Sequence, residues 1–241
     1  MSDLTIVSIY PALLRTYGDA GNVVALAHRA QVHGINAEVV SVAPGEAIPA
    51  TADLYVLGGG EDSAQTAAAR GIRADGSLMQ AADRGAAVLA ICAGYPLLGE
   101  YFPDATSTPA AGLDIIDIRT DRLPSRAVGE LAADPVLPGL PRLTGYENHG
   151  GATHLGPDVQ PLARVLAGVG NGDGTEGAIA GHIVGTYLHG PGLARNPVLA
   201  DLLLGWCVGR DLPTIVEPDV EALREERLRT VLGDDWNWSR G

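Results

Sequence analysis

The chain has 241 residues, of which 29 are Asp or Glu and 16 are Lys or Arg, so its net charge at neutral pH is −13. Hydrophobic residues make up 46% and charged residues 19%, a composition typical of a globular protein and not of a disordered one. The sequence has no cluster of Lys and Arg, which argues against binding to nucleic acid or to an anionic membrane surface.

The cysteines and the uncharged stretches bear on whether the protein has disulfides, a thiolate metal site or a membrane span. Cys92 and Cys207 lie far apart, so we expect neither a disulfide framework nor a thiolate metal site, and a reducing cytoplasm is the natural compartment. The longest uncharged stretch, residues 85–99, is too short to span a bilayer, and we expect no membrane insertion. No targeting segment is expected at the N-terminus.

In the first half of the chain, short apolar runs alternate with helical patterns. The predicted strands are residues 4–10, 37–42, 54–57 and 87–91, and the predicted helices are residues 22–32 and 78–84. This alternation predicts an α/β fold with a doubly wound, mostly parallel sheet flanked by helices. In such sheets the ligand site lies beyond the carboxyl ends of the strands.

The second half is richer in Gly and Pro and predicts a more antiparallel arrangement within one domain covering residues 1–241. The expected strands are residues 115–120, 128–131, 142–146, 164–169 and 183–187, with a turn at 170–174 and helices at 197–208 and 220–232. The tail, residues 234–241, contains Trp236 and Trp238 and is expected either to fray or to anchor a partner.

Cys92 is the strongest candidate for a chemical role. It follows the apolar run 87–91, and small residues surround it, as a sharp strand-to-helix turn that presents its central side chain requires. At a helix N-terminus a thiol ionises more readily and becomes a nucleophile. Cys207 lies inside a helical run and is expected to be an ordinary structural cysteine.

Three glycines, Gly58, Gly59 and Gly60, follow the strand 54–57. They allow the backbone to turn and present N–H groups, which could stabilise an oxyanion next to Cys92. By themselves they are equally consistent with a plain tight turn.

A nucleophilic cysteine needs a histidine to carry the proton. His189 stands at the carboxyl end of the strand 183–187, the side of the sheet where a site is expected, and His149 is its rival. Arg126 lies in a region of low charge and could hold a carboxylate bidentately, although a surface ion pair is the alternative. No metal-ligand spacing and no phosphate-binding loop are evident.

These residues lie in motifs that resemble those of the class I, triad-type glutamine amidotransferases of the cobyric-acid-synthase-like branch. The matching stretches are residues 10–14, 17–22, 58–65, 91–95, 146–151 and 187–191. They occur in the expected order over almost the whole chain. Within the branch, the resemblance is to the glutaminase subunits of lipid II isoglutaminyl synthases.

The resemblance implies that Cys92 is the nucleophile and His189 the general acid and base. It further implies that the N–H groups of Gly59 and Ala93 form an oxyanion hole and that Arg126 binds the α-carboxylate of glutamine. Glutamine would be hydrolysed to glutamate and ammonia through a thioester on Cys92. The ammonia would pass to a Mur-ligase-like (MurT-like) synthetase subunit that amidates D-glutamate of the peptidoglycan stem peptide. ATP and Mg²⁺ would bind to that partner, with no cofactor or metal in this chain.

The sequence departs from the family pattern in two places. Ala90 and Ala93 stand where many relatives carry glycine, so the turn at Cys92 must accept a methyl group. Pro191 stands where the third triad member, a Glu, usually follows the histidine, so we expect the partner subunit to supply an Asp or Glu in trans.

Three alternatives stay open from the sequence. The chain could serve another ammonia acceptor, such as a corrinoid. It could be a stand-alone cysteine hydrolase, for which Arg126 would not matter. It could also be a non-catalytic scaffold, which the missing Glu would favour and the intact Cys92 and His189 oppose.

Overall fold

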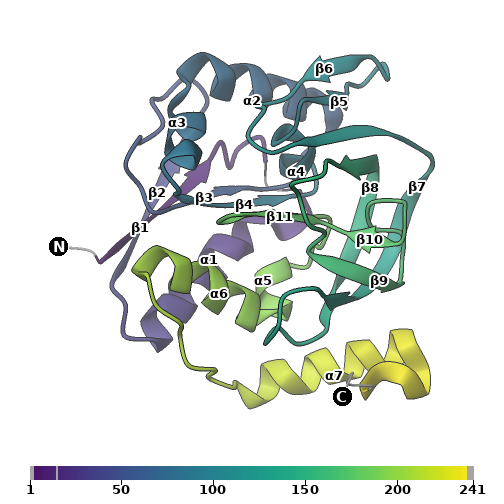
Figure 1. The fold of residues 1–241 in the computed structure, drawn as a ribbon. Coiled ribbons are helices and arrows are strands. Elements are labelled where there is room, and N and C mark those ends of the chain that lie inside the picture. The colour runs from purple at the N-terminus through teal and green to yellow at the C-terminus, as the bar shows by residue number, and fades with distance from the viewer. Residues whose placement is uncertain (1–2, 15, 238–241) are drawn as a thin grey trace.

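The computed structural model describes residues 3–14 and 16–237 and contains two β-sheets (Figure 1). The first sheet has the strand order β11-β12-β4-β3-β1-β2, and every neighbouring pair is parallel except β11 with β12. Its strands are β1 (Leu4–Ile9), β2 (Ala37–Val42), β3 (Leu54–Leu57), β4 (Ala87–Ile91), β11 (Ala178–Ala180) and β12 (Ile183–Thr186). The predicted doubly wound, mostly parallel sheet is confirmed. The strands predicted at 37–42, 54–57 and 87–91 are found with those bounds.

Helices cover both faces of this sheet (Figure 1). On one face lie α1 (Ala20–Val32) and α6 (Pro197–Val208), and on the other lie α2 (Asp62–Asp75) and α3 (Ser77–Asp83). Because β3 and β4 are sandwiched between these layers, every residue of both strands is buried, which explains their unbroken apolar sequences. Helix α2 was not predicted, and two of its four buried residues are small alanines, which give a weak apolar pattern.

The second sheet is antiparallel apart from one parallel contact, between β5 and β7, which confirms the expected change in the second half. Its strands are β5 (Tyr101–Pro103), β6 (Pro109–Ala111), β7 (Ile118–Pro135), β8 (Leu143–Leu155), β9 (Ala163–Ala167) and β10 (Thr175–Glu176). The prediction of separate strands at 115–120 and 128–131 was wrong. Residues 118–120 and 128–131 belong to the one long strand β7, because β8 pairs with it on either side of the interruption, and residues 115–117 precede it.

The pairing of β7 with β8 contains a bulge that matters for the site. Arg122 pairs with Gly151 and Ala127 with His149, so residues 123–126 stand opposite Gly150 alone. The extra residues leave the ladder and bend the strand locally. Arg126 is the last of them.

Three further helices complete the fold: α4 (Gly94–Leu97), α5 (Gly192–Arg195) and α7 (Pro218–Leu232), with single 3₁₀ turns at Thr16–Gly18 and Gly233–Asn237. The buried guanidinium of Arg224 ties α7 to the body of the protein by donating to the carbonyls of Arg142 and Arg195. The guanidinium carbon of Arg229 lies 4.2 Å from the centroid of the Trp236 ring. Trp238 lies outside the described residues. Within the described residues, no helix is long and apolar enough to cross a membrane.

Candidate active site

Three neighbouring strands of the first sheet end at the same place and deliver the candidate residues. β3 leads into the glycine loop, β4 into Cys92, and β12, through Tyr187 and Leu188, into His189. The site therefore lies beyond the carboxyl ends of parallel strands, where the predicted topology puts it.

Cys92 occupies a strained turn between β4 and α4. Its φ angle is +48°, in the left-handed region that residues other than glycine seldom adopt. The neighbours must be small: a Cβ on Gly94 would lie 2.9 Å from the Cβ of Leu57 and 3.0 Å from the carbonyl oxygen of Gly58. The turn accepts the methyl groups of Ala90 and Ala93, both of which are buried. The strand-to-helix turn expected from the sequence is thus present.

His189 is buried beside Cys92 and is held from several sides. Its Nδ1 lies 2.9 Å from Oδ1 of Asp19, and its backbone exchanges two hydrogen bonds with Tyr146, at 2.8 and 3.0 Å. Burial disfavours the charged imidazolium, but the hydrogen bonds to Asp19 and Cys92 and the charges of both groups outweigh burial and raise the pKa of His189 to about 10. His189 therefore carries a proton at neutral pH.

Asp19 is the site residue that sequence reasoning did not single out. It lies just before α1, its side chain is fully buried, and it pairs with His189 within this chain. Asp19 thus contacts the histidine from within this chain, and the carboxylate expected from a partner subunit stays a prediction. The available signal was the position of Asp19 inside the matching stretch 17–22.

The glycine loop differs from the expectation. The N–H of Gly59 donates to Oδ2 of Asp19 at 2.7 Å, so it is directed at the carboxylate and not at an oxyanion site. The oxyanion role expected of Gly59 stays a prediction, which requires its N–H to leave Asp19. Gly60 and Ala93 line the cleft next to Cys92. Space at Gly59 is tight, since a Cβ there would lie 2.8 Å from Asp19 Oδ2 and from His189 Cε1.

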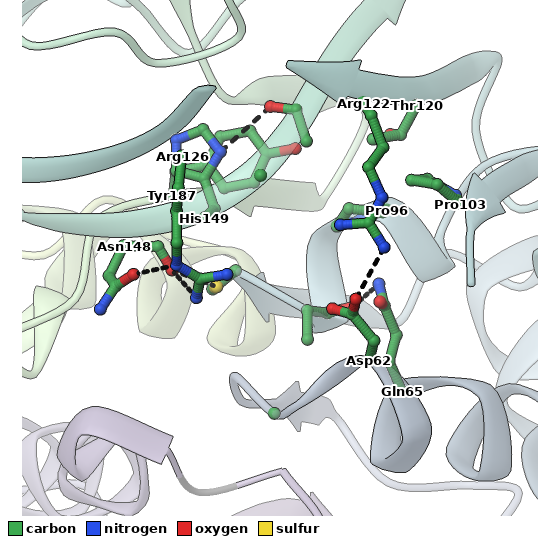
Figure 2. A pocket seen from close by; sticks show the side chains of 15 residues that line it. Asp62, Gln65, Pro96, Pro103, Thr120, Arg122, Arg126, Asn148, His149 and Tyr187 are labelled. Atoms are coloured by element: carbon green, nitrogen blue, oxygen red, sulfur yellow. Dashed lines mark hydrogen bonds and ion pairs between the residues drawn. The ribbon is translucent and has the colours of Figure 1, made fainter. Parts of the chain in front are cut away.

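Cys92 lines a cleft between the two sheets. Figure 2 shows the side chains that line this cleft. The cleft is lined by Gly60, Asp62, Gln65, Cys92, Ala93, Pro96, Pro103, Thr120, Arg122, Arg126, Asn148, His149, Gly150, Gly151 and Tyr187. Gln65 reaches in from α2, and its Nε2 donates to the carbonyl oxygen of Ala93 at 2.8 Å, which fixes the backbone next to Cys92.

Two arginines of β7 face this cleft, and their partners differ (Figure 2). Arg122 pairs with the carboxylate of Asp62 at 2.8 Å. Arg126 instead donates to Oδ1 of Asn148 at 2.5 Å and to its carbonyl oxygen at 3.1 Å, and no carboxylate of the described residues lies within ion-pair distance of it. Arg126 therefore offers a positive charge for an incoming carboxylate. The Sγ of Cys92 lies 3.8 Å from the same Asn148 carbonyl.

His149, the rival histidine, forms part of the cleft wall. Its ring stacks on Tyr187 with centroids 3.6 Å apart, its Nδ1 lies 3.0 Å from the carbonyl oxygen of Gly151, and its Nε2 lies 3.4 Å from Oε2 of Glu147. The structure thus places His189, and not His149, between Cys92 and the carboxylate of Asp19.

Two further features bear on the chemistry available. Cys207 lies in α6, where burial raises the pKa of its thiol to about 12, which fits an unreactive structural cysteine. In the part of the chain that the structure describes, no group of His, Cys, Asp and Glu is arranged to hold a metal ion.

The family follows from a match over most of the chain: residues 5–197 fit the model of the CobB/CobQ-like glutamine amidotransferase domain. The chain belongs to this glutamine amidotransferase family. Members of the family are amidotransferases that use glutamine, so the resemblance found in the sequence is confirmed and the protein is a glutamine amidotransferase.

Two kinds of curated protein are among those similar to this chain. The lipid II isoglutaminyl synthase (glutamine-hydrolyzing) subunit GatD of Staphylococcus aureus is 35% identical, over 98% of this chain and 98% of its own. The GatD subunit of Streptococcus pneumoniae is 33% identical over 82% of this chain and 77% of its own. Cobyric acid synthase of Sphingopyxis alaskensis is 35% identical, but over 69% of this chain and only 34% of its own length.

Solved structures show the same fold. A glutamine amidotransferase superposes with a TM-score of 0.57 at 19% identity, covering 83% of this chain and 98% of its own. The glutaminase domain of Trypanosoma brucei CTPS superposes with a TM-score of 0.52 at 11% identity, over 87% of this chain and 96% of its own.

Proposed function

We propose that this chain is the glutaminase subunit of a lipid II isoglutaminyl synthase. The observation that carries the proposal is the placement of Cys92, at a strained strand-to-helix turn that lines an open cleft, beside the buried His189. The end-to-end similarity to the GatD subunits favours this function over a corrinoid-directed one, because the match to cobyric acid synthase covers only a third of that protein.

In the proposed reaction, Arg126 binds the α-carboxylate of glutamine. This contact places the side-chain amide of glutamine over Cys92. The thiolate attacks the amide carbon, and the N–H of Ala93 stabilises the oxyanion that forms. His189 gives its Nε2 proton to the leaving nitrogen, which departs as ammonia and leaves a γ-glutamyl thioester. A water molecule then attacks the thioester, His189 takes up its proton, and glutamate leaves as the thiolate is restored.

The ammonia has to reach an acceptor activated elsewhere. We assign that activation to an ATP-dependent, Mur-ligase-like (MurT-like) partner, which would amidate D-glutamate of the peptidoglycan stem peptide in the cytoplasm. The support for a partner is that both GatD relatives are named as subunits. ATP and Mg²⁺ would then bind to the partner.

The test is the release of glutamate and ammonia from glutamine, by the purified chain alone and together with the co-expressed Mur-ligase-like protein. Cys92→Ala is the matched inactive control. Release that depends on Cys92, with transfer of the nitrogen to lipid II in the complex, supports the proposal. Glutaminase activity with no transfer to lipid II would favour another acceptor, and no release in either condition would exclude a glutaminase.

A further inference from the structure

The cleft beside Cys92 carries charges of both signs. Of the described residues that line it, Arg122 and Arg126 are cations and Asp62 alone has a carboxylate. Free glutamine is a zwitterion, so its α-carboxylate needs a cationic partner and its α-ammonium group an anionic one. We propose that Asp62 binds the α-ammonium group of glutamine while Arg126 binds the α-carboxylate. The inference rests on the proposed glutaminase function and deepens it.

Asp62 and Arg126 reach the cleft from different elements. Asp62 is the first residue of α2, and Arg126 belongs to the bulge of β7 (Figure 2). The first turn of α2 is tied to the backbone beside Cys92, because Gln65, three residues after Asp62 on the same side of the helix, donates to the Ala93 carbonyl at 2.8 Å. Asp62 therefore has a fixed place relative to the sulfur that would attack the substrate.

The carboxylate of Asp62 can take a second partner. Its Oδ2 accepts from Nη2 of Arg122 at 2.8 Å, whereas its Oδ1 accepts no hydrogen bond from any residue that the structure describes. The side chain of Asp62 is 40% exposed and that of Arg122 is 34% exposed. An exposed ion pair of this kind contributes little to stability, so a substrate ammonium can share the carboxylate at low cost.

Arg122 keeps other partners when Asp62 engages a substrate. Its Nε donates to Oγ of Ser107 at 2.8 Å, and its Nη2 also donates to the carbonyl oxygen of Asp104 at 2.7 Å. Both partners lie on the connection between β5 and β6. The guanidinium therefore stays anchored to this connection without Asp62, and substituting Asp62 should leave the wall of the cleft in place.

Three contacts would also select one mirror image of glutamine. The carboxylate, the ammonium group and the side chain of the substrate all branch from its Cα, and Arg126, Asp62 and Cys92 would each receive one of them. In the other enantiomer two of these groups exchange places, so at least one charge loses its partner. A site that pairs each polar group of its substrate discriminates strongly against a molecule that leaves one of its groups unpaired.

The test compares wild type with Asp62→Asn on two substrates, using the form that hydrolyses glutamine, either the chain alone or its complex with the synthetase subunit. The substrates are glutamine and 4-carbamoylbutanoate, which lacks only the α-ammonium group. We expect Asp62→Asn to lower kcat/KM for glutamine about 5- to 30-fold, mainly through KM, and to change the value for 4-carbamoylbutanoate less than about twofold. If 4-carbamoylbutanoate turns over too slowly, its inhibition constant against glutamine hydrolysis replaces kcat/KM.

The matched control is Asp121→Asn, which removes another exposed carboxylate next to Arg122 in sequence. Asp121 pairs with His154 at 3.2 Å and does not line the cleft. Its substitution should leave kcat/KM for both substrates unchanged. The preference of wild type for one enantiomer of glutamine should fall in Asp62→Asn and stay the same in Asp121→Asn.

Two results with Asp62→Asn would overturn the inference while leaving the glutaminase function intact. Equal losses for glutamine and 4-carbamoylbutanoate would show that Asp62 acts only through Arg122 or the fold. No loss for either substrate would place the ammonium group elsewhere. In contrast, wild-type protein that releases no glutamate from glutamine, alone or in complex, would contradict the proposed function itself.

A measurement on wild type alone applies if Asp62→Asn does not fold. Wild type should prefer glutamine over 4-carbamoylbutanoate by about 5- to 30-fold in kcat/KM, because only glutamine offers a group to the carboxylate. Equal values for the two substrates would overturn the inference.

Discussion

The backbones of Tyr146 and His189 exchange two hydrogen bonds, although Tyr146 belongs to β8 of the second sheet and His189 follows β12 of the first. This bridge fixes the position of the cleft wall relative to His189. Asn148 and its partner Arg126 stand on the same pair of strands as Tyr146, so the residues that would bind substrate are held in register with His189.

The two buried histidines should respond very differently to the same substitution. His189→Gln removes the proton carrier and should lower kcat for glutamine hydrolysis by about 10³-fold or more. His149→Gln removes only a wall group and should lower it less than about tenfold. Steady-state kinetics on both variants measure the two values of kcat, and thermal unfolding checks that both variants fold. A larger loss in His149→Gln would reverse the assignment of the proton carrier.

Arg126 should control the affinity for glutamine and not the chemical step. Losing one charged hydrogen-bonding partner of the α-carboxylate costs about 1.5–3 kcal/mol, so Arg126→Ala should raise KM about 10- to 100-fold with little change in kcat. Arg126→Lys should recover only part of the lost affinity for glutamine, since an ammonium cannot form the bidentate pair with a carboxylate. Arg119→Ala, which removes an exposed arginine of the same strand, is the control. An unchanged KM in Arg126→Ala would place the carboxylate site elsewhere.

Gly21 should prove essential for the position of the loop after His189. A Cβ at this residue of α1 would lie 2.3 Å from Cγ of Pro191, a rigid ring. Alanine favours a helix by about 1 kcal/mol, but the overlap should outweigh that gain and leave Gly21→Ala destabilised by about 1–3 kcal/mol, with a lower kcat. Gly192→Ala, which meets only ordinary contacts of 3.7 and 3.8 Å, should keep both stability and kcat. Chemical unfolding and steady-state assays measure the two effects.

Glu176 should make stability depend on pH. Its side chain is fully buried, and desolvation raises its pKa to about 7, although Thr186 and the Tyr187 N–H donate to it. Because the folded pKa lies above the ordinary value, the neutral carboxyl favours folding at low pH, and this contribution is lost as pH rises through about 7. The free energy of unfolding of wild type should therefore fall relative to Glu176→Gln between about pH 4.5 and 7 and stay constant above.

The control for this measurement is Glu225→Gln, which removes an exposed carboxylate on α7. Its stability curve should run parallel to that of wild type over the same range. Parallel curves for Glu176→Gln as well would show that Glu176 does not change its charge on folding.

Much of the first sheet could be predicted because each of its strands is marked by the residues of its own short stretch of sequence. The strand 87–91 is a continuous apolar run bounded by small residues, and Cys92, the proposed nucleophile, directly follows it. In contrast, Asp19 and His189 are 170 residues apart, and no spacing rule connects them. The direction of the Gly59 N–H likewise depends on Asp19, so the glycine motif alone could not specify it. That β7 is one strand could not be predicted for a similar reason, because its pairing partner, β8, lies further along the chain.

The bulge at residues 123–126 sets a limit on how this protein can vary. Residues 123–126 lie outside the ladder, so gaining or losing one residue there would change the path of the segment that carries Arg126, while Arg122 and Ala127 could keep their partners on β8. If Arg126 binds glutamine as proposed, such a change would yield a folded protein with a weaker affinity for glutamine. The length of this short segment, more than its composition, should therefore be the property that natural variants and engineered versions must keep.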